Sequence, residues 1–196
     1  MIEAVLFDAD GVIQEPSPAW RPALARLAGD ACADELLADI FAAEKPCLTG
    51  DQDFEPALAE VLKRWNCVVN VEEALGIWTM IQQDHEILRV IGQLRELGIR
   101  VALATNQQAQ RASFMSNQLG YSKLFDDLFY SCEMGYAKPH PEYFQIMLNR
   151  LGLAGEKVLF LDDRQSNVRA AESAGLHARV FMKNRGAAGL LNLLQE

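Results

Sequence analysis

Two aspartates near the N-terminus have the residue type and the spacing to do chemistry together. Asp8 and Asp10 follow the apolar residues 4–7 and flank Ala9, and Gly11 comes next. A short apolar run that ends at a turn residue is typical of a buried strand. Neighbouring carboxylates repel one another, so a cation, a shared proton or hydrogen bonds must offset their charge. Because open α/β folds bind ligands at the carboxyl ends of their strands, we expect a metal-dependent active site here.

Three further polar segments occur where predicted β-α elements meet. They are Thr105-Asn106 after the strand predicted at 99–104, Lys138 in a loop over 133–141, and Asp162-Asp163 after the strand predicted at 157–161. Each segment alone is also typical of a helix cap, a turn or an exposed lysine. The carboxyl ends of parallel strands meet at one edge of a sheet, however, so we expect these side chains to converge on the two aspartates.

The side chains in this set support a narrow range of reactions. Asp8 has a carboxylate that can attack phosphorus. Asp10, two residues further along an extended chain, is expected to point to the same side and can give a proton to a leaving oxygen or take one from water. The pattern therefore favours phosphoryl transfer.

The remaining members of the set suit a metal ion and a phosphate. Asp162 and Asp163, with the first aspartate, offer the hard oxygen ligands that Mg²⁺ prefers. Thr105, Asn106 and Lys138 offer hydroxyl, amide and ammonium groups to phosphate oxygens. A helix predicted to start near residue 107 would add free backbone N–H groups and the positive end of its dipole.

The elements that must position these residues form an α/β pattern. From residue 99 onward strands alternate with helices, which is typical of a doubly wound parallel sheet, and the strand at 4–7 belongs to it. Residues 12–18 are predicted as a linker because of Pro16 and Pro18. Residues 16–83 show helical periodicity and no good strand. We expect a core domain of residues 1–14 and 86–196 and an inserted all-helical cap domain of residues 15–85.

Composition excludes several classes of function. Half of the 196 residues are hydrophobic and the formal net charge is −9, which argues against nucleic acid or an anionic membrane as the main partner. The four cysteines lack metal-ligand spacing, so we expect reduced thiols. The sequence has no signal peptide and no apolar run of spanning length, so we expect a cytoplasmic, soluble protein. We expect a monomer or a homodimer.

The order of the motifs resembles that of a known family. They are Asp8-Ala9-Asp10-Gly11-Val12, Thr105-Asn106, Lys138-Pro139 and Asp162-Asp163. This order resembles the four motifs of the haloacid dehalogenase-like hydrolase superfamily, over the whole chain. The resemblance implies a Rossmann-like core, a small helical cap, Mg²⁺ and a small phosphorylated metabolite as substrate.

The resemblance also implies roles for single residues. It makes Asp8 the nucleophile and Asp10 the general acid/base, with the backbone carbonyl of Asp10 on Mg²⁺. It makes Asp163 a direct metal ligand and Asp162 a direct or water-mediated one. The threonine, asparagine and lysine named above would bind the transferring phosphoryl group.

Finer similarities narrow the expected reaction. The segments 104–107 and 137–144 are similar to those of sugar-1-phosphate phosphatases and of the N-terminal domain of bifunctional epoxide hydrolases. The acid at Asp10 favours phosphoryl transfer over carbon–halogen cleavage, since an alkoxide leaving group needs a proton and a halide does not. A sugar phosphomutase, a haloacid dehalogenase and a non-catalytic binding protein are the alternatives. Gln14, Glu15, Trp20 and Cys47 are candidates for substrate selection in the cap.

Overall fold

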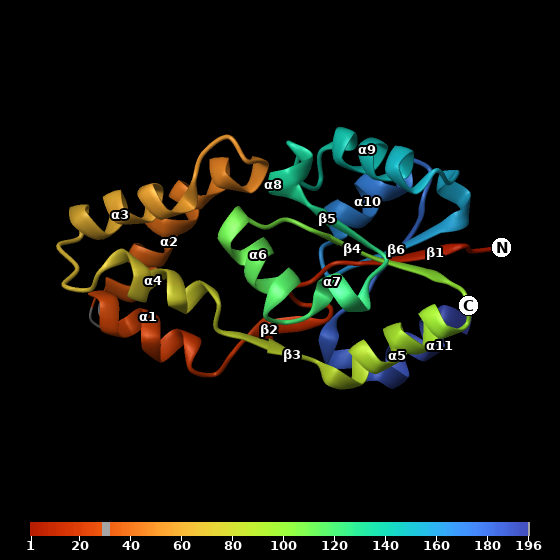
Figure 1. The fold of residues 1–196 in the computed structure, drawn as a ribbon, viewed down its shortest axis with the longest axis horizontal. Helices are drawn as coiled ribbons and strands as arrows, with labels where there is room; N and C mark the ends of the chain where they lie inside the picture. The colour runs from red at the N-terminus through yellow and green to blue at the C-terminus, as the bar shows by residue number, and fades with distance from the viewer. Residues whose placement is uncertain (29–31, 196) are drawn as a thin grey trace.

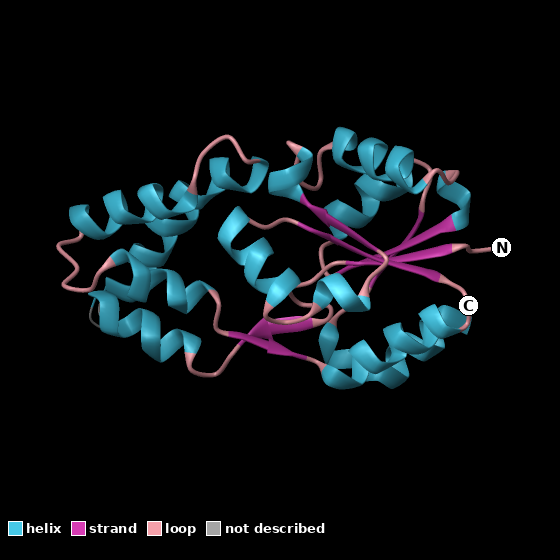
Figure 2. Cartoon of the chain, in the orientation of Figure 1, coloured by secondary structure: helices cyan, strands magenta, loops and turns pink. Residues whose placement is uncertain are grey.

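A five-stranded parallel sheet organises the larger part of the molecule (Figures 1 and 2). The computed structural model describes residues 1–28 and 32–195. The strands of this sheet are β1 Ala4–Phe7, β4 Arg100–Thr105, β5 Asp127–Tyr130, β6 Val158–Asp162 and β7 His177–Val180. Their order is β5-β4-β1-β6-β7, and every pairing is parallel. The predicted doubly wound α/β core is confirmed.

Helices cover both faces of this sheet (Figure 1). They are α5 His85–Glu96, α6 Ala109–Asn117, α7 Tyr121–Leu124 and α11 Gly186–Gln195 on one face, and α9 Pro141–Leu151 and α10 Gln165–Ser173 on the other. Because side chains alternate along a strand, Val5 and Phe7 of β1 enter the first layer while Ala4 and Leu6 enter the second. Both layers are apolar, which explains the continuous hydrophobic runs of the central strands.

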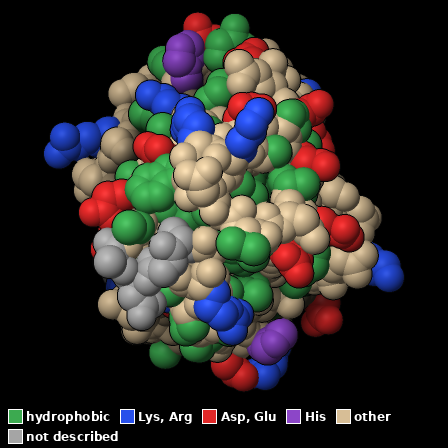
Figure 3. Space-filling model, turned by 90° about the vertical axis from the view of Figure 1, so that its left-hand side faces the viewer, with side chains coloured by type: hydrophobic (Ala, Val, Ile, Leu, Met, Phe, Trp, Pro, Cys, Tyr) green, Lys and Arg blue, Asp and Glu red, His purple; other side chains and the backbone are tan. Residues whose placement is uncertain are grey.

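A helical insertion, which we define as residues Trp20–Trp78, stands beside the carboxyl edge of the sheet (Figure 1). Its elements are α1 Trp20–Ala28, α2 Ala33–Glu44, the 3₁₀ helix η2 Lys45–Thr49, α3 Phe54–Arg64 and α4 Val71–Trp78. A hydrophobic cluster of its own, including Leu24, Ile40 and Leu58, holds these helices together. Figure 3 views the molecule from this end, where acidic and basic side chains lie interspersed with apolar ones.

Two short strands join the insertion to the sheet. β2 Gln14–Pro16 pairs antiparallel with β3 Ile81–Gln83. The prediction of a linker over residues 12–18 and of a block without strands over 16–83 was therefore wrong at these positions. Pro16 is tolerated because it sits in an edge strand. We propose that the domain boundary runs through this ribbon, close to the predicted residues 14 and 86.

Two smaller expectations also need correction. The segment predicted as a loop over 133–141 begins within a short helix, α8 Ser131–Met134, which follows β5 directly. The helix predicted over 71–81 stops at Trp78. No helix among residues 1–28 and 32–195 is long and apolar enough to cross a bilayer.

Candidate active site

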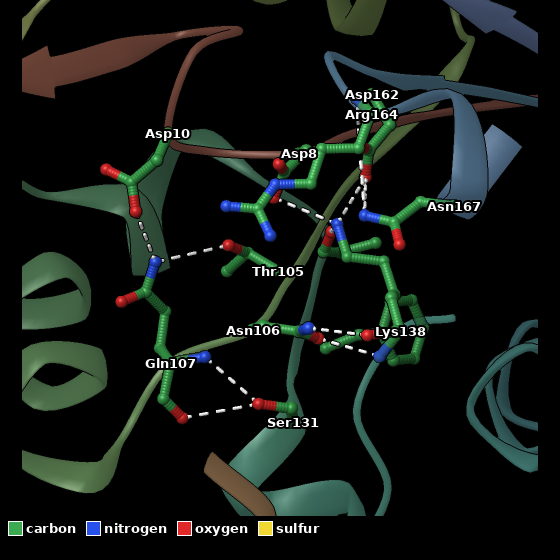
Figure 4. A network of polar contacts seen from close by, with 12 residues as sticks. Asp8, Asp10, Thr105, Asn106, Gln107, Ser131, Lys138, Asp162, Arg164 and Asn167 are labelled. Atoms are coloured by element: carbon green, nitrogen blue, oxygen red, sulfur yellow. Dashed lines mark hydrogen bonds and ion pairs between the residues drawn. The ribbon is translucent and has the colours of Figure 1, made fainter. Parts of the chain in front are cut away.

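The predicted site residues gather at the carboxyl ends of three neighbouring strands (Figure 4). β1 lies between β4 and β6, and Asp8 directly after it donates its backbone N–H to Leu161 O at 2.8 Å. Thr105 is the last residue of β4, and Asp162 is the last of β6. Chain order reverses around β1, and open α/β sheets bind their ligands at such a position. The topology therefore explains why residues far apart in sequence meet here.

Lys138 is the centre of this group. Its Nζ lies 2.9 Å from Asp8 Oδ1 and 2.6 Å from Asp162 Oδ2, and it donates to Ala104 O at 2.7 Å. Only 1% of its side chain is exposed. Asn106 holds the Lys138 backbone from both sides, donating to Lys138 O and accepting from Lys138 N at 2.8 Å each. The lysine is thus a fixed buried cation, as required beside two buried carboxylates.

Asp162 is fully buried, and its carboxylate is saturated with donors. Besides Lys138, it accepts from the Asn167 side chain at 3.0 Å on each oxygen and from the Arg164 backbone N–H at 2.8 Å (Figure 4). Asn167 did not appear among the predicted site residues. Its place five residues after Asp162, on the first turn of α10, was the available signal.

The electrostatics of this cluster raise the pKa of both Asp8 and Lys138, which favours a neutral carboxyl and a charged ammonium. Burial raises the pKa of Asp8 to about 6, with Asp162 and Asp10 adding to the rise and Lys138 opposing it. Burial alone would lower the pKa of Lys138, but the two carboxylates outweigh it and raise that pKa above its ordinary value. An added cation would relieve the excess negative charge around Asp8.

Carboxylate oxygens of Asp8, Asp162 and Asp163 lie within 4.8 Å of one another. Asp163 Oδ1 is buried and has no hydrogen-bond partner among the described residues, so this oxygen is free for a ligand. Three carboxylates with one unsatisfied oxygen fit a hard cation such as Mg²⁺. Gly11 makes room for this arrangement, since a Cβ on it would lie 2.6 Å from Asp163 Oδ2.

Asp10 is turned away from this cluster, toward α6 (Figure 4). Its oxygens accept from Arg111 Nη1 at 2.7 Å and Nη2 at 2.8 Å, from Gln107 Nε2 at 2.8 Å and from Gln14 Nε2 at 3.0 Å. Burial pushes the pKa of Asp10 upward, but the Arg111 guanidinium and the two amides outweigh it and hold this pKa below its usual value. Arg111 and Gln107 were missing from the predicted site, because polar residues four apart on a helix usually face solvent.

The segment after β4 forms the floor of the site. Thr105 is buried, and its Oγ1 accepts from Gln107 Nε2 at 3.2 Å. The helix expected from residue 107 begins at Ala109 instead, and the Gln107 backbone N–H donates to Ser131 Oγ at 3.0 Å. This N–H is therefore engaged by the protein rather than free for a phosphate.

A cavity of about 500 Å³ opens above these residues. The core lines it with the polar side chains described above, and the helical insertion lines it with Trp20, Phe41, Glu44 and Trp78. Of the candidates for substrate selection, Trp20 reaches this cavity.

The other three candidates have different surroundings. Gln14 is fully buried and bonds Asp10 and Tyr121, while Glu15 pairs with Lys183 at 2.8 Å. Cys47 lines a second, smaller cavity.

Glu44 is the acidic side chain that the insertion contributes to the main cavity. Burial raises its pKa to about 7; Asp10 adds to this rise, while Arg111 and a hydrogen bond from Trp78 oppose it. The carboxyl therefore changes its charge near neutral pH. Glu44 is the last residue of α2, and the sequence pattern alone does not distinguish it from an exposed polar residue of that helix.

The chain is similar in sequence to curated phosphatases. The chain is 28% identical over 182 residues to the Phosphorylated carbohydrates phosphatase of Thermotoga maritima, covering 89% of this chain and 82% of that one. It is 29% identical over 85 residues to the Phosphoglycolate phosphatase of Salmonella typhi, where it covers 43% of this chain and 34% of that one.

Two solved structures share the fold. A predicted HAD-like family hydrolase from Porphyromonas gingivalis superposes with a TM-score of 0.82 at 23% identity, covering 100% of this chain and 99% of that one. A HAD family enzyme of Bacteroides thetaiotaomicron, solved with magnesium and inorganic phosphate, gives 0.77 at 19% identity, covering 92% and 94%. The family model of haloacid dehalogenase-like hydrolases matches residues 2–175 of this chain. The chain therefore belongs to this family.

Proposed function

We propose that the protein is a Mg²⁺-dependent phosphatase that hydrolyses a small phosphomonoester through an aspartyl-phosphate. One observation carries the proposal: the buried Asp8 carboxylate lies 2.9 Å from a fixed lysine and shares a three-carboxylate cluster that fits a divalent cation. A nucleophile, an anion-binding cation and a metal-ligand set thus meet at the floor of one cavity. The named phosphatase relatives and the neighbour solved with magnesium and phosphate support the same reaction.

Each residue has a distinct task in the proposed cycle. Thr105 binds a phosphoryl oxygen through its hydroxyl. Lys138 attracts the phosphoryl group chiefly by its charge, because its three N–H groups already go to Ala104 O, Asp8 and Asp162. Asp10 must enter the cycle protonated, and the arriving phosphate dianion favours that form because like charges raise the pKa of a carboxyl. Asp8 attacks phosphorus, the bond from phosphorus to the leaving oxygen breaks, and Asp10 gives that oxygen its proton. Asp10 then takes a proton from water, which attacks the aspartyl-phosphate and releases inorganic phosphate and free Asp8.

A metal ion would be held by Asp8, Asp163 and the backbone carbonyl of Asp10. Bound Mg²⁺ would offset the repulsion between the anionic nucleophile and the anionic phosphate. Asp162, the third carboxylate of the cluster, would act on the metal through water while it holds Lys138, because its own oxygens already accept four hydrogen bonds.

The leaving group is expected to lie against the aromatic wall of the cavity. Trp20 and Phe41 provide apolar area there, and Glu44 provides a polar contact. This wall suits a small organic phosphate, with a sugar phosphate as one candidate. The 29% identical phosphoglycolate phosphatase indicates that a phosphorylated hydroxy acid belongs in the same screen.

The test is release of inorganic phosphate from p-nitrophenyl phosphate and from a panel of phosphorylated metabolites, with Mg²⁺ and with EDTA. Asp8→Asn is expected to lose at least ~10³-fold in kcat while keeping a cooperative thermal transition, because the nucleophile is removed. Asp34→Asn, an exposed change on the helical insertion, is the matched control and is expected to keep full activity. Undiminished turnover in Asp8→Asn would refute the nucleophile. Isomerised product without phosphate release would indicate a mutase.

A further inference from the structure

The carboxylate of Asp10 is held by an unusually complete set of donors. Both Nη atoms of Arg111 contact it, one on each oxygen, at 2.7 and 2.8 Å. Two amide groups, from Gln107 and Gln14, add one bond each at 2.8 and 3.0 Å. A planar guanidinium that bonds both oxygens fixes the plane of a carboxylate, whereas a single hydrogen bond from a side-chain amide lets the carboxylate rotate.

Arg111 is itself fixed by two further contacts. Its Nε donates to Trp78 O at 3.0 Å, and its Nη1 donates to Gln107 Oε1 at 3.0 Å. Only 15% of the side chain is exposed. Because Trp78 is the last residue of α4, the guanidinium joins three places at once: core helix α6, the loop after β1 and the end of the helical insertion.

We propose that Arg111 is a positioning residue that fixes the orientation of the Asp10 carboxyl relative to the leaving group and ties it to the position of the helical insertion. The inference rests on the proposed phosphatase function, in which Asp10 gives the leaving oxygen its proton. In this role Arg111 acts through Asp10 and through the Trp78 carbonyl rather than on the reacting atoms.

The proposal predicts an effect that depends on the leaving group. A stable phenolate leaves without a proton, but an alkoxide needs one, so the orientation of Asp10 matters most for alkyl phosphates. The constant kcat/KM reports the steps up to the first irreversible one, which is departure of the alcohol. Loss of Arg111 should therefore lower kcat/KM more steeply as the pKa of the leaving alcohol rises.

The experiment measures kcat/KM for a series of aryl and alkyl phosphates with the wild type, Arg111→Gln and Arg111→Lys. We expect Arg111→Gln to lose at least ~50-fold with alkyl phosphates and less than ~5-fold with 2,4-dinitrophenyl phosphate, within the range of general-acid catalysis. Arg111→Lys is expected to behave like Arg111→Gln, since one ammonium cannot bond both oxygens. Arg89→Gln, which removes an exposed pair on α5, is the matched control and is expected to match the wild type.

A double-variant cycle separates positioning from general destabilisation. In an Asp10→Asn background, Arg111→Gln is expected to add little further loss, because the group that it positions is already gone. An equal loss for all leaving groups, no loss, or full additivity with Asp10→Asn would overturn the inference while leaving the phosphatase function intact. A wild type that hydrolyses none of these esters would instead refute the phosphatase function, and the inference with it.

Discussion

The rim of the sheet and the helical insertion face the same cavity but are built differently. At the rim, Lys138, Asp8 and Asp162 hold one another through contacts of 2.6 to 2.9 Å. On the insertion side, the lining combines three aromatic side chains, Trp20, Phe41 and Trp78, with Leu48, Glu44 and Lys45, and Phe41 is half exposed. Fixed charges suit a reaction at phosphorus, because they are oriented before the substrate arrives. A partly open apolar wall suits recognition of the rest of the substrate.

This contrast has a structural cause. Asp8 follows β1 and Asp162 ends β6, and the side chains of both strands are packed on both faces, so two hydrophobic layers fix these backbones. The backbone of Lys138 is held in its loop by Asn106. The insertion has one core of its own and reaches the sheet through the β2–β3 ribbon. Variants in the two regions should therefore separate loss of chemistry from loss of selectivity.

The largest effect is expected at the rim, from Lys138→Met. Removal of the ammonium leaves two buried carboxylates without their cation, which typically costs about 3 to 5 kcal/mol of unfolding free energy. Phosphate release should be lost as well. Urea unfolding and a phosphate assay measure both effects. Lys157→Met, which breaks an exposed pair with Glu3, is the matched control and should change neither. If the two variants were equally stable, the contacts of Lys138 with Asp8 and Asp162 would not stabilise the folded protein.

A second test compares two glycines with the same backbone conformation. Gly11 and Gly98 both have φ of +82°, but a Cβ on Gly11 would meet Asp163 Oδ2 at 2.6 Å, whereas a Cβ on Gly98 would meet nothing within 4 Å. Alanine at either position should cost about 1 to 2 kcal/mol for the left-handed backbone. Gly11→Ala alone should also weaken Mg²⁺ activation, by about 10- to 100-fold, as displaced metal-site neighbours do. If both variants need the same Mg²⁺ concentration for activation, the lack of a side chain at Gly11 is not what shapes the metal site.

A third prediction concerns stability against pH on the insertion side. Folding raises the pKa of Glu44 from 4.5 to about 7, so the folded state favours the neutral carboxyl. The stability linked to Glu44 is complete below pH 4.5 and is lost as pH rises through about 7. As pH rises from 5 to 8, the unfolding free energy of Glu44→Gln should therefore increase relative to that of the wild type, on the order of 1 to 3 kcal/mol. Urea unfolding at several pH values measures the difference, and parallel profiles would contradict a buried acid.

The smallest effect is expected from Phe41→Ala. The Phe41 side chain is 50% exposed and lines the cavity, so its loss should raise KM for the natural substrate by roughly three- to tenfold through lost apolar contact. The unfolding free energy should change by no more than about 0.5 kcal/mol. Leu97→Ala, 80% exposed and outside the cavity lining, is the control for surface truncation. A fall in kcat with KM unchanged would place Phe41 with the chemistry rather than with selectivity.

Much of the fold and of the candidate site was predictable because its signals are local. The largely apolar segments 4–7, 99–104 and 157–161 indicate buried strands, and the polar residues that follow them mark where each strand ends. Parallel strands then bring Asp8, Thr105 and Asp162 to one edge without further information. The roles of these residues stay predictions, but their convergence is observed.

What the sequence by itself determined about this protein is the order of strands and helices and the polar residues near the strand ends, because continuous apolar runs and helical patterns are written in neighbouring residues. Only the tertiary structure decided the β2–β3 ribbon, the pairing of Arg111 with Asp10, and the partly buried Glu44. Each of these depends on a contact between segments far apart in the chain. A three-residue strand and a polar residue on a helix carry no periodic signal of such a partner, since burial of a polar group is set by what packs over it.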